Sequence, residues 1–127
     1  MRVVEQLINQ VIFSSSRLSL TEMRVRITGT GSRKKKEILG AAIRDALVAA
    51  GVGSAVKSVE VEGDRGGGDL TYDTFIDFND RISGRRLATK VKRLAKLPPK
   101  WELFHLAHVN AGGYRMVLRL IEYSKNQ

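Results

Sequence analysis

The chain has 127 residues, of which 43% are hydrophobic and 28% charged, a composition typical of a globular domain and not of a disordered segment. Its 22 Lys and Arg residues outnumber 13 Asp and Glu residues, so the formal net charge is +9, which favours nucleic acid, an anionic surface or an acidic protein as partner. It contains no cysteine, which excludes disulfides, thiolate metal sites and cysteine nucleophiles.

The first part of the chain predicts a separate helix. Apolar residues recur at helical spacing from Val3 to Ile12 with polar residues between them, which is typical of an amphipathic helix. We expect this helix and a serine hinge to occupy residues 1–16, and a single α+β domain to occupy residues 17–127. The helix either packs on its own sheet or is exchanged between protomers.

The same segment bears on location. Polar residues interrupt its apolar ones, so it lacks the layout of a signal peptide. Elsewhere the chain has no stretch that approaches the roughly 18–20 apolar residues needed to span a bilayer. We therefore expect a cytoplasmic protein without a membrane partner.

A predicted strand over residues 18–28 leads into a glycine-flanked turn and a helix that begins with four consecutive cations. Ser32 is a suitable N-cap, and the apolar spacing predicts a helix from there to about Ala50, ended by Gly51. Cations beside the positive end of a helix dipole are unfavourable unless an anion binds there. We interpret this turn as a phosphate site, the alternative being a solvated helix start. Its residues are Ser32, Arg33, Lys34, Lys35 and Lys36.

Residues 56–62 and 70–78 alternate in polarity and predict two strands around a glycine-rich loop. This hairpin concentrates carboxylates, which are hard oxygen ligands for Mg²⁺ or Ca²⁺. The weak metal candidates are Glu60, Glu62, Asp73 and Asp77. We favour an exposed acidic face, or one paired with basic residues, because carboxylates on a strand point outward in parallel whereas a metal needs converging ligands. A metal-dependent nuclease is the only catalytic function that we considered.

Residues 81–100 contain eight basic residues and no acidic one. Leu87, Val91 and Leu94 form an apolar seam at helical spacing, and two prolines end the predicted helix. On a helical projection, Arg85, Lys92 and Lys96 fall in one narrow stripe, which the remaining cations widen. The predicted phosphate contacts in this stretch are Arg81, Arg85, Arg86, Lys92, Arg93 and Lys96.

Residues 101–109 and 114–123 predict two further strands around the turn from Asn110 to Gly113. Both have apolar residues on both faces, so we expect both faces to be covered and the protein to form a homo-oligomer. His105 and His108 stand three apart in a strand, so we expect their side chains to point to opposite faces and to be poor joint metal ligands. We expect no cofactor.

The order of the elements without the first helix and the last strand is βαββαβ, which predicts a split-βαβ (ferredoxin-like) core. An extra N-terminal helix and an added C-terminal edge strand complete the expected α+β fold. Two helices should cover one face of an antiparallel sheet.

The leading functional hypothesis is a small non-enzymatic nucleic-acid-binding protein that contacts phosphates through two basic helix surfaces. A second is an interaction protein, such as an inhibitor, an adaptor or a small viral modulator, that docks its basic helix on an acidic partner. A third is binding of a small anionic nucleotide at the turn Gly29–Lys36.

Overall fold

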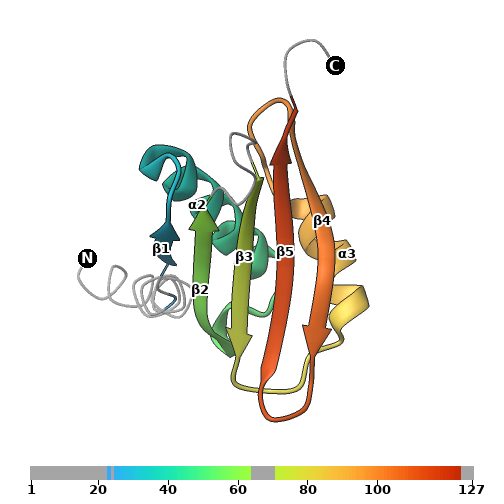
Figure 1. The fold of residues 1–127 in the computed structure, drawn as a ribbon. Helices are drawn as coiled ribbons and strands as arrows, with labels where there is room; N and C mark the ends of the chain where they lie inside the picture. Colours follow the sequence, from blue (N-terminus) through green and yellow to red (C-terminus); the bar gives the residue numbers. More distant parts are fainter. Residues whose placement is uncertain (1–22, 24, 64–70, 124–127) are drawn as a thin grey trace, which may run out of the picture.

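A computed structural model describes residues 23, 25–63 and 71–123, which form a mixed α+β fold (Figure 1). The predicted helix and hinge over residues 1–16 lie outside the described residues. The strands are β1 (Val25–Gly29), β2 (Val56–Gly63), β3 (Thr71–Phe78), β4 (Trp101–Val109) and β5 (Tyr114–Glu122). The helices are α2 (Arg33–Ala49), α3 (Gly84–Leu94) and the short 3₁₀ helix η1 (Gly53–Ala55).

The five strands form one sheet in the order β1-β2-β3-β5-β4. This order corrects the ferredoxin-like prediction, because in a split βαβ unit another strand separates the two parallel strands, whereas β1 pairs directly with β2. The last strand is not at an edge either: β5 lies between β3 and β4, antiparallel to both. The burial agrees with these positions. Met116, Leu118 and Leu120 of β5 are fully buried, as in a central strand, whereas β4 is exposed from Leu106 to Val109, as in an edge strand.

Both α-helices cover the same face of the sheet (Figure 1). The apolar stripe of α2 buries Leu39, Ile43 and Leu47, and α3 buries Leu87 and Val91, which confirms both helical patterns. Gly51 follows α2 with a φ of 84°, in the left-handed region that favours glycine.

Helix α3 begins three residues later than Arg81, with which the predicted basic stretch starts. The preceding loop is fixed by the side chain of Asn110, which accepts a hydrogen bond from the Ile82 amide and donates one to the Ile82 carbonyl, each at 3.2 Å. The first helical residue, Gly84, packs against the ring of His108, which leaves no room for a Cβ atom. Tertiary contacts with the β4–β5 turn therefore set the start of this helix.

The two α-helices run in opposite directions. Because β1 and β2 are parallel, α2 runs back along the sheet between them. Strands β3 and β4 are both antiparallel to β5 and therefore parallel to each other, so α3, which connects them, runs in the opposite direction to both. Since β3 is antiparallel to β2, the direction of α3 is also opposite to that of α2. The cationic starts of α2 and α3 therefore lie at opposite ends of the helix layer.

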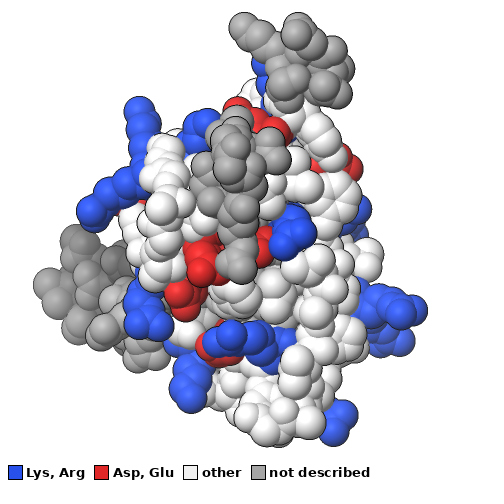
Figure 2. Space-filling model, viewed as in Figure 1, with Lys and Arg blue, Asp and Glu red and all other residues white. Residues whose placement is uncertain are grey.

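No element of the described residues packs on the other face of the sheet (Figure 1). Figure 2 shows this face with acidic side chains near its middle and basic side chains beside them. The homo-oligomer that would cover this face stays a prediction. None of the helices in the described part of the chain is long and apolar enough to cross a membrane.

Candidate nucleic-acid interface

The turn before α2 is held together by its own side chains. Ser32 caps the helix as predicted, since its Oγ accepts a hydrogen bond from the Lys35 amide at 3.1 Å. The amide of Ser32 donates to the hydroxyl of Tyr72 at 3.1 Å. Lys36 is only 4% exposed, and its Nζ donates to the carbonyl oxygens of Thr28, Gly29 and Thr30 at 2.8, 3.1 and 3.0 Å. The buried ammonium of Lys36 thus holds together three consecutive carbonyls of the turn.

Two of the other cations in this cluster have carboxylate partners. Arg33 Nε lies 3.1 Å from Glu37 Oε2, and Lys35 Nζ lies 2.9 Å from Glu122 Oε1 at the end of β5. Lys34 is exposed and has no ion-pair partner among the described residues. The spacing of Arg33 and Glu37 on one helix could have been recognised in the sequence. The pairing with Glu122, 87 residues away, could not.

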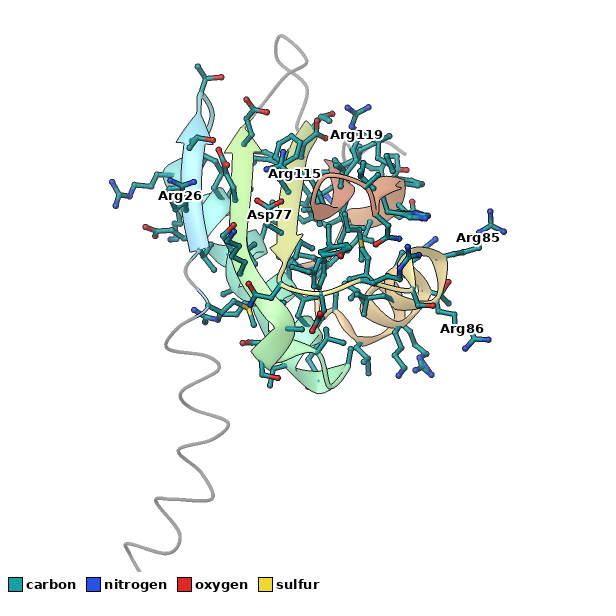
Figure 3. The ribbon with its side chains drawn as sticks, turned by 90° about the horizontal axis from the view of Figure 1, so that it is seen from below. Arg26, Asp77, Arg85, Arg86, Arg115 and Arg119 are labelled. Carbon is teal, nitrogen blue, oxygen red and sulfur yellow. The ribbon has the colours of Figure 1, made fainter. Side chains whose placement is uncertain are left out.

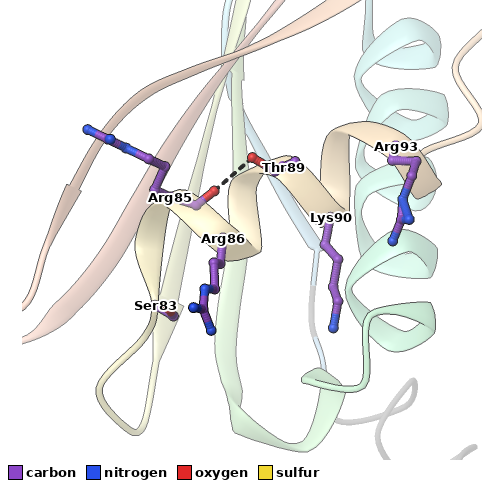
Figure 4. A pocket seen from close by; sticks show the side chains of 6 residues that line it. All are labelled: Ser83, Arg85, Arg86, Thr89, Lys90 and Arg93. Carbon is purple, nitrogen blue, oxygen red and sulfur yellow. Dashed lines mark hydrogen bonds between the residues drawn. The ribbon is translucent and has the colours of Figure 1, made fainter.

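Helix α3 differs because its cations remain exposed and unpaired. Arg86, Lys90 and Arg93 recur at i, i+4 and i+7, and their side chains project to the same side of the helix (Figure 4). They border a shallow groove, which Ser83, Arg85 and Thr89 also line. No ion pair joins any α3 cation to a carboxylate within residues 25–63 and 71–123. We call these three residues, with Arg85, the α3 cation cluster.

The residues of α3 that line the groove differ in part from the stripe that the sequence predicted. Of the predicted stripe, Arg85 lines the groove and Lys92 does not. Lys92 Nζ lies instead 5.8 Å from the ring centroid of Phe104 on β4. Lys96 is exposed beyond the end of α3, and Arg81 is exposed in the loop before it. Lys90, which we did not place among the contacts, lines the groove. A helical projection locates charges around the axis but does not show which side faces β4.

A second pocket, of about 360 Å³, adjoins the groove. It lies between the end of α2, η1 and the start of α3. Its apolar lining comprises Ala50, Val52, Ala55, Phe78, Ile82 and Leu87. Arg81, Arg86 and Lys90 line it as well, so that cations border an apolar floor. Sequence reasoning missed this pocket because its walls come from elements far apart in the chain.

Three of the described carboxylates of the hairpin pair with basic residues of the same chain. Asp77 binds Arg115 through two hydrogen bonds of 2.7 and 2.9 Å. Asp73, whose side chain is 5% exposed, binds Arg119 in the same way at 2.8 and 3.1 Å. Hydrogen bonds from the Arg115 guanidinium lower the pKa of Asp77 below its ordinary value.

Glu60 likewise accepts a hydrogen bond from Thr28 at 3.0 Å and lies 3.9 Å from Arg26. The expectation of an acidic face paired with basic residues is thereby confirmed for Glu60, Asp73 and Asp77. Within the described residues, no group of three or more potential ligands converges on one point, Glu62 included. In Figure 3, Arg115 and Arg119 lie close to the strands, whereas Arg85 and Arg86 extend outward from α3.

The two histidines lie side by side, so the prediction that they point to opposite faces is wrong. The register of β4 against β5 shifts between His105 and Ala107, and this bulge resets the alternation of side chains. The rings stack with centroids 5.1 Å apart, and His108 Nδ1 lies 3.2 Å from His105 Nε2. Burial lowers the pKa of His105, and the neighbouring His108 lowers it further.

No protein-family model matches this chain, and no curated protein sequence matches it either. The chemistry of the site therefore rests on its own residues. The α3 cation cluster and the pocket beside it offer guanidinium and ammonium donors around an apolar floor, an arrangement that suits an anionic ligand with an apolar part.

Proposed function

We propose that this protein binds nucleic acid, and that α3 contacts its phosphates. The observation that carries the proposal is the α3 cation cluster: four exposed cations border one groove, without a carboxylate partner among the described residues. Unpaired like charges repel one another and destabilise the folded state. An anionic partner removes that cost, and the repeating charges of a phosphate backbone match a row of cations.

The position of the cluster on the helix adds to this argument. Arg85 and Arg86 lie in the first turn of α3, where the positive end of the helix dipole disfavours cations, and this turn contains no acidic residue. Arg115 and Arg119, on the other face of the sheet, are in contrast bound to carboxylates. Within the described part of the chain, unneutralised charge is thus concentrated on the helix side, which we infer to be the binding side.

Contacts of this kind predict a particular mode of binding. Phosphate contacts position a protein on nucleic acid without distinguishing sequences, and they release counterions. Affinity should therefore fall steeply with salt, with little dependence on base sequence. Lys34 at the start of α2 is a secondary contact in this proposal, and Lys36 is not a contact because its ammonium is bound to three carbonyls.

The internal bonds of the α2 turn also weigh against a nucleotide site at Gly29–Lys36. The amide of Ser32 is bound to Tyr72, the Ser32 hydroxyl caps the helix, and Lys36 is buried. Few groups remain to hold a phosphate there. We therefore retain nucleic acid as the partner and α3 as its surface.

The test is fluorescence anisotropy with labelled DNA and RNA over a series of salt concentrations. We expect binding by the wild type at about 50 mM salt and a linear loss of log affinity with log salt. The double substitution Arg86→Gln and Lys90→Gln should flatten the slope by about one unit per lost phosphate contact. Its matched control, Arg26→Gln with Lys57→Gln on β1 and β2, removes the same charge away from α3 and should preserve the slope. Undetectable binding of every nucleic acid at low salt would refute the proposal.

A further inference from the structure

The apolar pocket beside the α3 cation cluster is open at the protein surface and contains no charged group in its floor. Phe78 and Leu87 are 4% and 6% exposed, whereas Val52, Ala55 and Ile82 are only half-buried. Half-buried apolar side chains that share one pocket gain further stabilisation when a ligand removes them from water. This floor therefore favours an apolar or aromatic group.

The pocket and the groove are continuous. Ser83, Arg86 and Lys90 line both of them, so a ligand whose charged part follows the groove passes the mouth of the pocket. Ser83 precedes α3, but its side chain makes no capping hydrogen bond. Its hydroxyl can therefore donate to, or accept from, the polar edge of a bound group.

We propose that the ligand is single-stranded nucleic acid and that one unstacked base enters this pocket, while neighbouring phosphates bind Arg86, Lys90 and Arg93. The proposal rests on the nucleic-acid function above and specifies the form of nucleic acid. A base presents an apolar ring with a polar edge, and the backbone phosphates that flank its nucleotide lie only a few bonds from it. These are the parts that the pocket floor, Ser83 and the cations would take up.

A duplex would use only half of this site. Its bases are paired and stacked inside the helix, so it offers phosphates to the groove and nothing to the pocket. A single strand can turn a base outward at little cost, and burial of that base then adds to the affinity. The pocket beside the groove thus predicts that single strands bind more tightly than duplexes, a preference that charge alone would not produce.

The experiment compares a short labelled oligothymidylate with the same strand made abasic and with its duplex, all at one salt concentration. We expect the intact strand to bind about tenfold more tightly than either of the others. Ala55→Leu should fill the pocket and abolish this preference, while leaving the salt slope intact because no cation is removed.

The matched control Ala107→Leu adds the same side chain to an exposed position on β4 and should change neither quantity. Thermal unfolding monitors whether Ala55→Leu still folds, and Ala50→Leu, at another residue that lines the pocket, provides a second way to fill it. A 2-aminopurine base in the strand should change its fluorescence on binding to the wild type and not to either filled variant.

Three outcomes would overturn the inference in different ways. Equal, salt-dependent binding of the intact, abasic and duplex probes, with no effect of Ala55→Leu, would refute base insertion and leave the phosphate-binding function standing. Absence of binding to all three probes and to the corresponding RNA would refute the function itself. Binding of only an acidic peptide with apolar side chains would also overturn both proposals and assign the pocket to a protein partner.

Discussion

Two clusters of basic residues resemble each other in the sequence and differ in the structure. At the start of α2, Lys36 is buried among carbonyl oxygens, and Arg33 and Lys35 are paired with glutamates. On α3, Arg86, Lys90 and Arg93 are exposed and unpaired within the described residues. A run of cations therefore does not show whether its charge is available to a partner, since that depends on carboxylates and carbonyls elsewhere in the fold.

The first prediction compares one lysine from each cluster. Lys36→Met should lower the free energy of unfolding by about 3 kcal/mol, because three carbonyl oxygens of the β1–α2 turn lose their donor. Lys90→Met, the matched substitution on α3, should change it by less than about 0.5 kcal/mol, since Lys90 is exposed and unpaired. Urea denaturation measures both values. Equal effects would contradict the distinction between the clusters.

The second prediction concerns arginines that are already bound to carboxylates. Asp73→Ala should destabilise the fold by about 2 kcal/mol, because it removes a nearly buried carboxylate and leaves Arg119 unpaired. Asp77→Ala, whose ion pair is more exposed, should cost about 1 kcal/mol or less. Thermal or urea denaturation checks the order of the two. Equal stability of the two variants would contradict the expectation that the more buried ion pair contributes more to the free energy of unfolding.

The third prediction uses the histidine pair that lies against the start of α3. Burial keeps the folded-state pKa of His105 below its ordinary value of 6.5, so the unfolded chain takes up the proton first as the pH falls. The free energy of unfolding should therefore decrease from about pH 7.5 through 6.5 and on to the lowered pKa. His105→Gln should remove this part of the pH dependence. An unchanged pH profile in the variant would show that His105 does not titrate in this range.

The smallest expected effect is at the exposed end of the α2 cluster. Arg33→Gln removes an exposed ion pair with Glu37 and should lower the free energy of unfolding by at most about 0.5 kcal/mol. Lys34→Gln, which breaks no ion pair among the described residues, is its control. A loss of several kcal/mol from either variant would indicate that the start of α2 depends on these charges.

Much of the local structure could be predicted from the sequence. The apolar spacing located both α-helices, and the alternation located the strands and the faces of β3 and β5, because burial on one side imposes a period on each element. The capping role of Ser32 and the end of α2 at Gly51 also followed from the residues alone. These features depend on neighbours within one turn or one strand.

The strand order and the environment of each charge could not be predicted in this way. The direct pairing of β1 with β2 and the inner position of β5 depend on how whole elements pack. One bulge in β4 brought His105 and His108 together, because a single extra residue reverses the alternation of every side chain after it. The pocket beside α3 joins η1, β3 and α3, and no local pattern indicates it.

The central claim is that, among the described residues, the α3 cation cluster is the main phosphate-binding surface. The most direct measurement compares two double variants that each lose two positive charges: Arg86→Gln with Lys90→Gln on α3, and Arg33→Gln with Lys34→Gln on α2. The account predicts that the α3 variant flattens the salt dependence of single-strand binding by about 1.4 units, roughly 0.7 per lost phosphate contact. The α2 variant should flatten the slope by at most half as much, through the secondary contact of Lys34. An equal loss of slope in both variants, or a larger loss in the α2 variant, would contradict the account.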